Sequence, residues 1–479
     1  MESLAADKDD LESDALLPPA AATSTTAASL NWTLLSLALP LTLRFLLFIG
    51  ANLLQLALAP RYASPYTSSA VLIAALSLAN MFANISCLSF LVGLGTVVST
   101  LASQYNGAKE YRQVGLTLQR SLLIMTLLVI PLIPLWYFAE SFWRKMGVDA
   151  QVCLIIGEYL RIRLLNLPAD IVRESYEAFL MSLGVMHFPM LGSITLDLSL
   201  LLLNLLGLYL GYKDYRNLIY IYVFCNYLSL LVQILASWSH SAVQRTLQPF
   251  DKAAFQEWGD FLRLGVPSIL MLCSEWWAYE LLVVMATFLG TQHIDAQAIL
   301  FQLIYLAFMI PMGVGTSLAT LTGNSLGNNS IVEAKKICWH ALRMSSCVEL
   351  FVGAAMFSFG KYFIAFFTSD PDIVAIAVEA LPLVSVYVMF DGMQAIACGV
   401  LRGAGKQYIG AYLNGFAFYV VGLPLAWVFC FNYDMGVKGL VMGISVASSI
   451  QFTVMLYLIT CRDDLIFVPF IAVADNCQV

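Results

Sequence analysis

The sequence predicts an all-α integral membrane protein in which twelve transmembrane helices form two pseudo-symmetric six-helix lobes around a central cavity. Three observations predict this fold class: the composition, the recurrence of apolar segments and an internal repeat. Of the 479 residues, 60% are hydrophobic and 11% are charged, and the mean hydropathy is +0.80. About a quarter of the residues in soluble globular domains are charged. The composition therefore excludes a soluble globular fold and indicates a protein embedded in the lipid bilayer.

The apolar segments recur from Trp32 to Cys461 and are about twenty residues long, the length that a helix needs to cross the hydrocarbon core. The twelve predicted spans are 33–57, 68–100, 117–138, 151–177, 187–211, 217–240, 261–289, 295–322, 338–360, 373–398, 408–431 and 437–460. With the N-terminus in the cytosol, more Lys and Arg residues fall in cytosolic loops than in the opposite loops. This distribution and the even number of spans predict that both termini are cytosolic.

An internal repeat divides these spans into two halves. Gly93-Leu94-Gly95-Thr96 recurs 220 residues later as Gly313-Val314-Gly315-Thr316. Three further pairs share this offset: Thr100, Leu101 and Gly107 with Thr320, Leu321 and Gly327. A weaker pair, Leu180–Gly184 and Leu401–Gly405, agrees at nearly the same offset. Six spans lie in each half, so the repeat is parallel and relates the lobes by an axis along the membrane normal. This architecture is typical of alternating-access transporters.

The predicted organisation has five parts. They are a disordered, acidic cytosolic tail (1–31), the N-lobe (32–240), a polar cytosolic linker (241–260), the C-lobe (261–461) and a second cytosolic tail (462–479). The ten cysteines and four histidines are dispersed, which predicts neither disulfides nor a metal site. The chain has no Gly-Lys-Ser/Thr phosphate-binding loop, so bound ATP is not expected to drive it. No cofactor is expected.

One carboxylate lies where a charge is least stable. Glu275 falls near the midpoint of the apolar stretch Phe261–Leu289, and a charge at the bilayer centre costs about 2.5–3.5 kcal/mol. Burial disfavours the ionised form of a carboxyl, so its protonation is expected to respond to water or to a cation. Asp391 also lies among apolar neighbours. This chemistry suits a proton-coupled carrier; the alternative is a structural glutamate paired to a neighbouring helix.

Helix geometry separates Glu275 from the second acid of the same span, Glu280. Residues five apart on a helix differ by about 140° in direction and about 7.5 Å in height. One of the two is therefore expected to face the cavity while the other braces a neighbouring helix. Glu275 is the preferred titrating group, because it is nearer the midplane and Tyr279 can hydrogen-bond near it.

A lone arginine, Arg44, lies at about mid-membrane in the first span and needs an acidic partner. Asp197 lies at similar depth in the fifth span, so an Arg44–Asp197 pair is predicted. Asp170 and Glu174 are the alternative partners. A neutral pair of this kind would not titrate near neutral pH, so the N-lobe is not expected to carry the coupling proton.

Several short motifs occur together in one order. In the second half they are Glu275–Glu280 (Glu-Trp-Trp-Ala-Tyr-Glu), Ile294–Gln297, Met309–Gly313, Asn324–Gly327 and Gly399–Gln407. In the first half they are Gly107–Lys109 and Leu118–Arg120. As an ordered set, from about Leu34 to Tyr457, they resemble the eukaryotic multidrug and toxic compound extrusion (MATE) proteins.

The resemblance implies a secondary antiporter that exports organic cations and other amphipathic small molecules in exchange for protons by alternating access. It also implies that the proton chemistry lies in the C-lobe. Glu275 and Glu280 match the acidic pair of helix 7, Asp295 matches an acid that opens helix 8, and Asp391 matches the acid of helix 10. The plasma membrane or a vacuolar or endosomal membrane is the expected location. A monomer without nucleic-acid partners is expected.

Other residues and functions complete the hypothesis. Candidate cavity-lining residues are Trp276, Tyr279, Gln302 and Tyr305, of which Trp276 could contact a cation or serve only in packing. An enzyme is not expected, because Asp370 and Asp372 are too isolated to bind magnesium together. The main alternative is a lipid or lipid-linked oligosaccharide flippase of the same superfamily fold, although a lipid phosphate would call for a basic cavity. The sequence leaves sodium open as the coupling ion.

Overall fold

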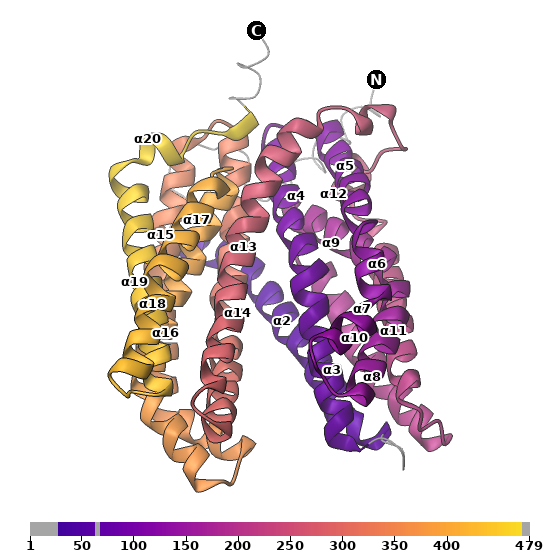
Figure 1. Ribbon diagram of the computed structural model, residues 1–479. Coiled ribbons are helices and arrows are strands. Elements are labelled where there is room, and N and C mark those ends of the chain that lie inside the picture. The colour runs from indigo at the N-terminus through magenta and orange to yellow at the C-terminus, as the bar shows by residue number, and fades with distance from the viewer. Residues whose placement is uncertain (1–26, 63–67, 472–479) are drawn as a thin grey trace, which may run out of the picture.

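The computed structural model describes residues 27–62 and 68–471. Residues 1–26 of the predicted first tail and 472–479 of the predicted second tail lie outside these ranges. The described residues form helices and no strands, which confirms the all-α fold class. Figure 1 shows two groups of helices that approach each other at one end of the molecule and diverge towards the other.

The N-lobe contains the helices that precede the linker. They are α2 (Ala27–Leu58), η1 (Ala59–Tyr62), α3 (Ser69–Ala83), η2 (Asn84–Leu88), α4 (Ser89–Gly107), α5 (Tyr111–Val129), α6 (Leu132–Tyr137), α7 (Ala139–Lys145), α8 (Ala150–Arg163), η3 (Leu164–Asn166), α9 (Leu167–Ser182), α10 (His187–Tyr209) and α11 (Tyr215–Ser237). Pro168 follows η3 in the first turn of α9, a position that needs no intrahelical N–H donor.

The linker and the C-lobe contain the remaining helices. The linker holds α12 (Ser241–Thr246) and η4 (Lys252–Phe255). The C-lobe holds α13 (Trp258–Thr287), α14 (Thr291–Gly327), α15 (Ile331–Phe367), α16 (Pro371–Gly403), α17 (Gln407–Asn414), η5 (Gly415–Gly422), α18 (Leu423–Trp427), η6 (Val428–Asn432) and α19 (Val437–Cys461), followed by α20 (Asp463–Ile466).

Ten segments of the described chain are long and apolar enough to cross a membrane. The other two predicted spans correspond to α5 with α6 and to α8 with α9. Their hydropathy is lower because they carry charged side chains, such as Arg120 in α5 and Asp170 and Arg173 in α9. Asp170 and Arg173 form an ion pair of 2.7 Å inside the lobe. The helix order is thus that of a twelve-helix layout.

Both ends of the described chain lie on one side of the molecule. Near its start, α15 contacts α2 through His340 and Asn31. One turn earlier, Lys335 donates to Asp463 of α20 at 2.5 Å. We call this side the terminal side; the two lobes approach each other there in Figure 1.

The glycines of the internal repeat explain how closely the lobes approach. A methyl group on Gly313 of α14 would lie 2.3 Å from Oγ1 of Thr42 on α2. At the equivalent position of the first half, a methyl on Gly93 of α4 would lie 2.9 Å from Cα of Ile269 on α13. The same repeat position therefore lets each lobe's second helix pack against the first helix of the other lobe.

At the terminal side the two copies of the repeat contact each other directly. A methyl on Gly107 would lie 2.0 Å from the backbone oxygen of Asn324, and one on Gly327 would lie 1.9 Å from the backbone oxygen of Gln104. Gln104 and Asn324 are themselves 220 residues apart. The two contacts are therefore equivalent under the pseudo-symmetry, and both require a residue without a Cβ atom.

Four hydrogen bonds between the lobes follow the same pseudo-symmetry. Side chains of α4 donate to the end of α16, and side chains of α14 donate to the end of α9. The bonds are Thr100 Oγ1 to Arg402 O at 2.8 Å, Gln104 Nε2 to Gly403 O at 2.9 Å, Thr320 Oγ1 to Met181 O at 3.2 Å and Asn324 Nδ2 to Ser182 O at 3.3 Å. We call these residues, together with Gly107 and Gly327, the terminal gate.

The C-terminal segment reinforces the terminal gate. The side-chain oxygen of Gln104 accepts hydrogen bonds from the backbone amides of Phe470 and Ile471, at 3.0 and 3.3 Å. Phe470 packs into the N-lobe core. Lys335 donates to Asp463 and thereby lowers the pKa of that carboxyl, so the contact persists into acidic solution. The segment after α19 therefore contacts both lobes.

The linker is held against the N-lobe by two ion pairs. Arg112 of α5 contacts Asp251 at 2.7 Å, and Arg120 contacts Glu257 at 2.6 Å. The backbone amide of Ala253 and the Arg112 guanidinium lower the pKa of Asp251. The linker thus packs against α5.

Candidate functional site

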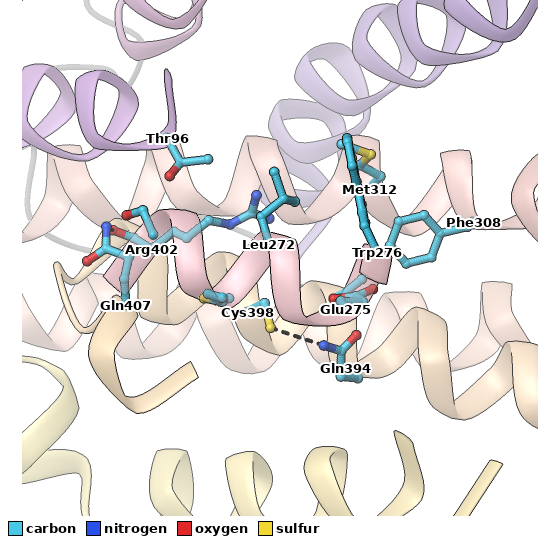
Figure 2. Close-up of a pocket in the computed structure, with 13 residues that line it drawn as sticks. Thr96, Leu272, Glu275, Trp276, Phe308, Met312, Gln394, Cys398, Arg402 and Gln407 are labelled. Carbon is cyan, nitrogen blue, oxygen red and sulfur yellow. Dashed lines mark hydrogen bonds between the residues drawn. The ribbon is translucent and has the colours of Figure 1, made fainter. Parts of the chain in front are cut away.

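A pocket between the C-lobe and α4 of the N-lobe contains the predicted central acid. Its lining comes from α13, α14 and α16, with one residue from α4 and one from α17: Thr96, Ser268, Met271, Leu272, Glu275, Trp276, Phe308, Met312, Gln394, Ala395, Cys398, Arg402 and Gln407. Figure 2 shows Glu275 beside Gln394, with Trp276, Phe308 and Met312 nearby. The pocket lining therefore combines an acidic residue, Glu275, and a basic residue, Arg402, with apolar and aromatic side chains.

Asp391 lies behind this pocket, in a polar network between three helices. Its carboxylate accepts hydrogen bonds from Ser448 of α19 at 3.3 Å and from the hydroxyl of Tyr279 at 3.4 Å. Tyr279 also hydrogen-bonds to Tyr387. Asp391 is 2% exposed and close enough to Glu275 for the two charges to interact. The structure thus brings together Glu275 and Asp391, the two acids predicted to lie among apolar neighbours.

The other two predicted acids lie outside this pair. Glu280 is half-buried on α13 and does not line the pocket. Asp295 is exposed in the second turn of α14, at the end opposite the terminal side. The resemblance placed all four acids in one coupling group, whereas the geometry groups only Glu275 and Asp391.

The predicted cavity-lining residues divide in a similar way. Trp276 lines the pocket, and Tyr279 belongs to the network around Asp391. Gln302 and Tyr305 are exposed on α14, outside the pocket. Tyr305 shares its helix face with Phe308, three residues on, so it continues the stripe that lines the pocket, away from the terminal side.

Three polar residues of this region were missed in the sequence reasoning. Gln394 and Arg402 line the pocket, and Glu349 of α15, which is 1% exposed, lies against Gly392, the residue that follows Asp391. The signal for Glu349 was available, because it is a carboxylate inside an apolar span, like Glu275. Gln394 carries no charge and leaves no comparable signal.

The predicted partner of Arg44 is wrong. Arg44 forms its ion pair with Glu177 of α9, and its guanidinium also lies 4.8 Å from the centroid of the Phe45 ring. A pocket in the N-lobe is lined by Arg44, Glu177 and Asp197, but the Asp197 carboxylate lies against Gly50. The depth of a residue in the membrane can be estimated from its position in the sequence only to within about one helical turn. Glu177 lies one turn after Glu174, which is one of the alternative partners.

Neutralising Arg44 is expected to reduce the yield of folded protein, because it leaves Glu177 as a buried charge without its partner. Breaking a buried pair typically costs about 3–5 kcal/mol. Adding Glu177→Gln to Arg44→Gln should restore most of the yield, measured by detergent size-exclusion chromatography and thermal unfolding. The matched control, Arg44→Gln with Asp197→Asn, should not. Equal rescue by both doubles would contradict the pairing.

A family model, MatE, matches residues 40–210 and 267–428. Multidrug and toxin extrusion protein 1 of Homo sapiens is 30% identical over 382 residues, covering 79% of this chain and 66% of that protein. The same-named protein of Xenopus tropicalis is 32% identical over 375 residues, covering 77% and 64%. An uncharacterised transporter of Schizosaccharomyces pombe is 30% identical over 389 residues, covering 78% and 70%. The chain thus spans about two thirds of these relatives.

Solved structures agree with this assignment in fold. The crystal structure of the eukaryotic MATE transporter AtDTX14 superposes with a TM-score of 0.83 at 23% identity, covering 90% of this chain and 96% of that chain. A multidrug resistance MATE transporter in its outward-facing conformation gives 0.80 at 18% identity, covering 90% and 95%. The chain is a multi-pass membrane transporter that belongs to the MATE family.

Proposed function

We propose that the protein exports organic cations and other amphipathic small molecules in exchange for protons. The observation that carries this proposal is the position of Glu275, a 9% exposed carboxyl in a pocket at the interface of the lobes, with Asp391 close behind it. Two buried carboxyls that interact disfavour double ionisation. A proton or a cationic substrate can each relieve this repulsion, and the two therefore compete for the site.

The wall of the pocket supports the amphipathic part of the proposal. Trp276 and Phe308 offer aromatic faces to a cation, and Met312 offers an adaptable apolar surface. Arg402 is the one basic residue in the pocket lining, and with Asp391 included the acids outnumber it. This balance favours a cationic solute over the phosphate of a lipid-linked oligosaccharide.

The terminal gate supports an alternating-access cycle. With both termini in the cytosol, the gate closes the cytosolic side, and the described conformation corresponds to the outward-facing state. A proton can shift the equilibrium between two lobe arrangements only by binding one of them more tightly. Protonation of Glu275 and Asp391 in the outward-facing state would supply that difference and release the substrate.

The proposal predicts a pH-dependent affinity. Binding of a fluorescent organic cation to the detergent-solubilised protein should weaken by roughly tenfold or more between about pH 7 and about pH 5, the range in which a desolvated carboxyl takes up a proton. Proteoliposomes should accumulate the same cation when the opposite compartment is acidic. Accumulation that requires a sodium gradient and ignores pH would overturn the proton assignment, and flipping of a labelled lipid without cation uptake would favour the flippase.

A further inference from the structure

One buried acid outside the pocket has no hydrogen-bond partner in the part of the chain that the structure describes. Glu349 of α15 is 1% exposed, and both its carboxylate oxygens lack a partner among the described residues. One turn earlier on the same helix face, Ser345 is equally buried, and its hydroxyl also has no partner within residues 27–62 and 68–471. Leaving an ionised carboxylate in such surroundings costs several kcal/mol.

The carboxyl of Glu349 occupies a space that a glycine provides. A methyl group on Gly392 of α16 would lie 2.3 Å from Oε2 of Glu349. One turn along α15, a methyl on Gly353 would lie 3.0 Å from the backbone oxygen of Ser385. The two glycines bring α15 and α16 into close contact, and they place Glu349 next to the residue that follows Asp391.

Among the titratable groups on the helices that pack against α15, Asp391 is the one that interacts electrostatically with Glu349. α15 packs against α16, α14 and α2. The titratable residues on these three helices are Asp372, Glu379, Tyr387, Asp391, Cys398 and Arg402, then His293, Asp295 and Tyr305, and Arg44. Besides Glu349, α15 itself carries Glu333, Lys335, Lys336, Cys338, His340, Arg343, Cys347, Lys361 and Tyr362. Of these, Asp391 interacts electrostatically with Glu349, and within residues 27–62 and 68–471 Glu349 forms no ion pair. Neutrality therefore requires a proton on Glu349.

We propose that Glu349 is a second proton-binding site of the C-lobe, occupied in this conformation, and that it exchanges its proton with Asp391 across the contact at Gly392. In this step the Glu349 carboxylic acid gives its proton to the Asp391 carboxylate, leaving Glu349 ionised and Asp391 neutral. The proposal rests on the proton-coupled function proposed above and extends the coupling group from two acids to three. The unpartnered hydroxyl of Ser345 is placed to solvate the ionised form.

Infrared spectroscopy tests the site without relying on transport. The difference spectrum of the purified wild-type protein between acidic and alkaline pH should contain a protonated-carboxyl band that is missing in Glu349→Gln and shifted in Glu349→Asp. The control Glu379→Gln, an exposed acid on α16 that pairs with Lys438 at 2.5 Å, should leave that band unchanged. Identical bands in wild type and Glu349→Gln would overturn the proposal, and if Glu349→Gln does not fold, an unshifted band in Glu349→Asp would do the same.

Transport separates this proposal from the proposed function. Cation uptake should depend on pH less steeply in Glu349→Gln than in the wild type, by about a factor of ten per pH unit, because each titrating proton contributes about a factor of ten. Glu349→Asp should restore the steeper dependence. A proton-coupled wild type with an unchanged slope in Glu349→Gln would refute the role of Glu349 alone. A wild type that ignores the proton gradient would refute the proposed function itself.

Discussion

Glu275→Gln is expected to reduce proton-driven cation uptake to the level of empty liposomes. The amide preserves the size and burial of the side chain but stays neutral, so it cannot alternate between holding a proton and holding a cation. Uptake driven by an imposed pH gradient should fall by well over tenfold, and substrate affinity should depend on pH much less steeply than in the wild type. Both are measured on protein of matched yield in proteoliposomes.

Two further substitutions locate the effect. Asp391→Asn should be nearly as damaging, because it removes the acid that interacts with Glu275 while keeping an oxygen that accepts from Tyr279 and Ser448. Glu280→Gln should reduce uptake far less, since Glu280 lies on the same helix but outside the pocket. Coupled uptake that survives in Glu275→Gln would place the coupling proton elsewhere.

Much of the fold follows from the sequence, because hydrophobic burial in a membrane imposes length and composition on every span. The hydropathy signal is weakest for the spans that carry charged side chains, such as Arg120 in α5 and the Asp170–Arg173 pair in α9. The lobe relationship was also predictable, since the repeat offset of 220 residues recurs in the contacts of Gly107 with Asn324 and of Gly327 with Gln104.

The site was predictable only where a single residue carried the signal. Glu275 and Asp391 are charges in apolar spans, and such charges are unstable without a function or a partner. The partner of Arg44 depends on the rotation and depth of α9, which differ by one turn between Glu174 and Glu177. Sequence spacing does not resolve a difference of that size.

The positions of Asp295 and Glu349 show the limits of a resemblance. A motif match carries a residue type to a position, but it does not state whether that position faces the pocket. Asp295 is exposed near the start of α14, whereas Glu349 is buried against Gly392 and belongs to none of the matched motifs. Helix packing decides both cases, since Gly392 provides the space that the Glu349 carboxyl fills.

Gly107→Ala is expected to impair closure of the terminal gate and thereby slow transport. The added methyl would lie 2.0 Å from the backbone oxygen of Asn324, so α4 and α14 would have to separate. Overpacking of this kind costs about 1–3 kcal/mol, which corresponds to a shift of roughly 5- to 150-fold in the equilibrium between the two lobe arrangements. Gly327→Ala should have a similar effect, because its methyl would lie 1.9 Å from the oxygen of Gln104.

Cross-linking separates a defect of closure from a loss of folding. Asn106 donates to Asn324 at 2.7 Å, so cysteines at these two positions should be joined by a short bifunctional thiol reagent in a background with Cys347, Cys461 and Cys477 replaced by serine. Gly107→Ala and Gly327→Ala should slow this reaction and lower cation uptake together. The control Gly415→Ala adds a methyl with no atom within 4 Å and should change neither. Fast cross-linking and normal uptake in both gate variants would show that the lobes close without the close approach of α4 and α14.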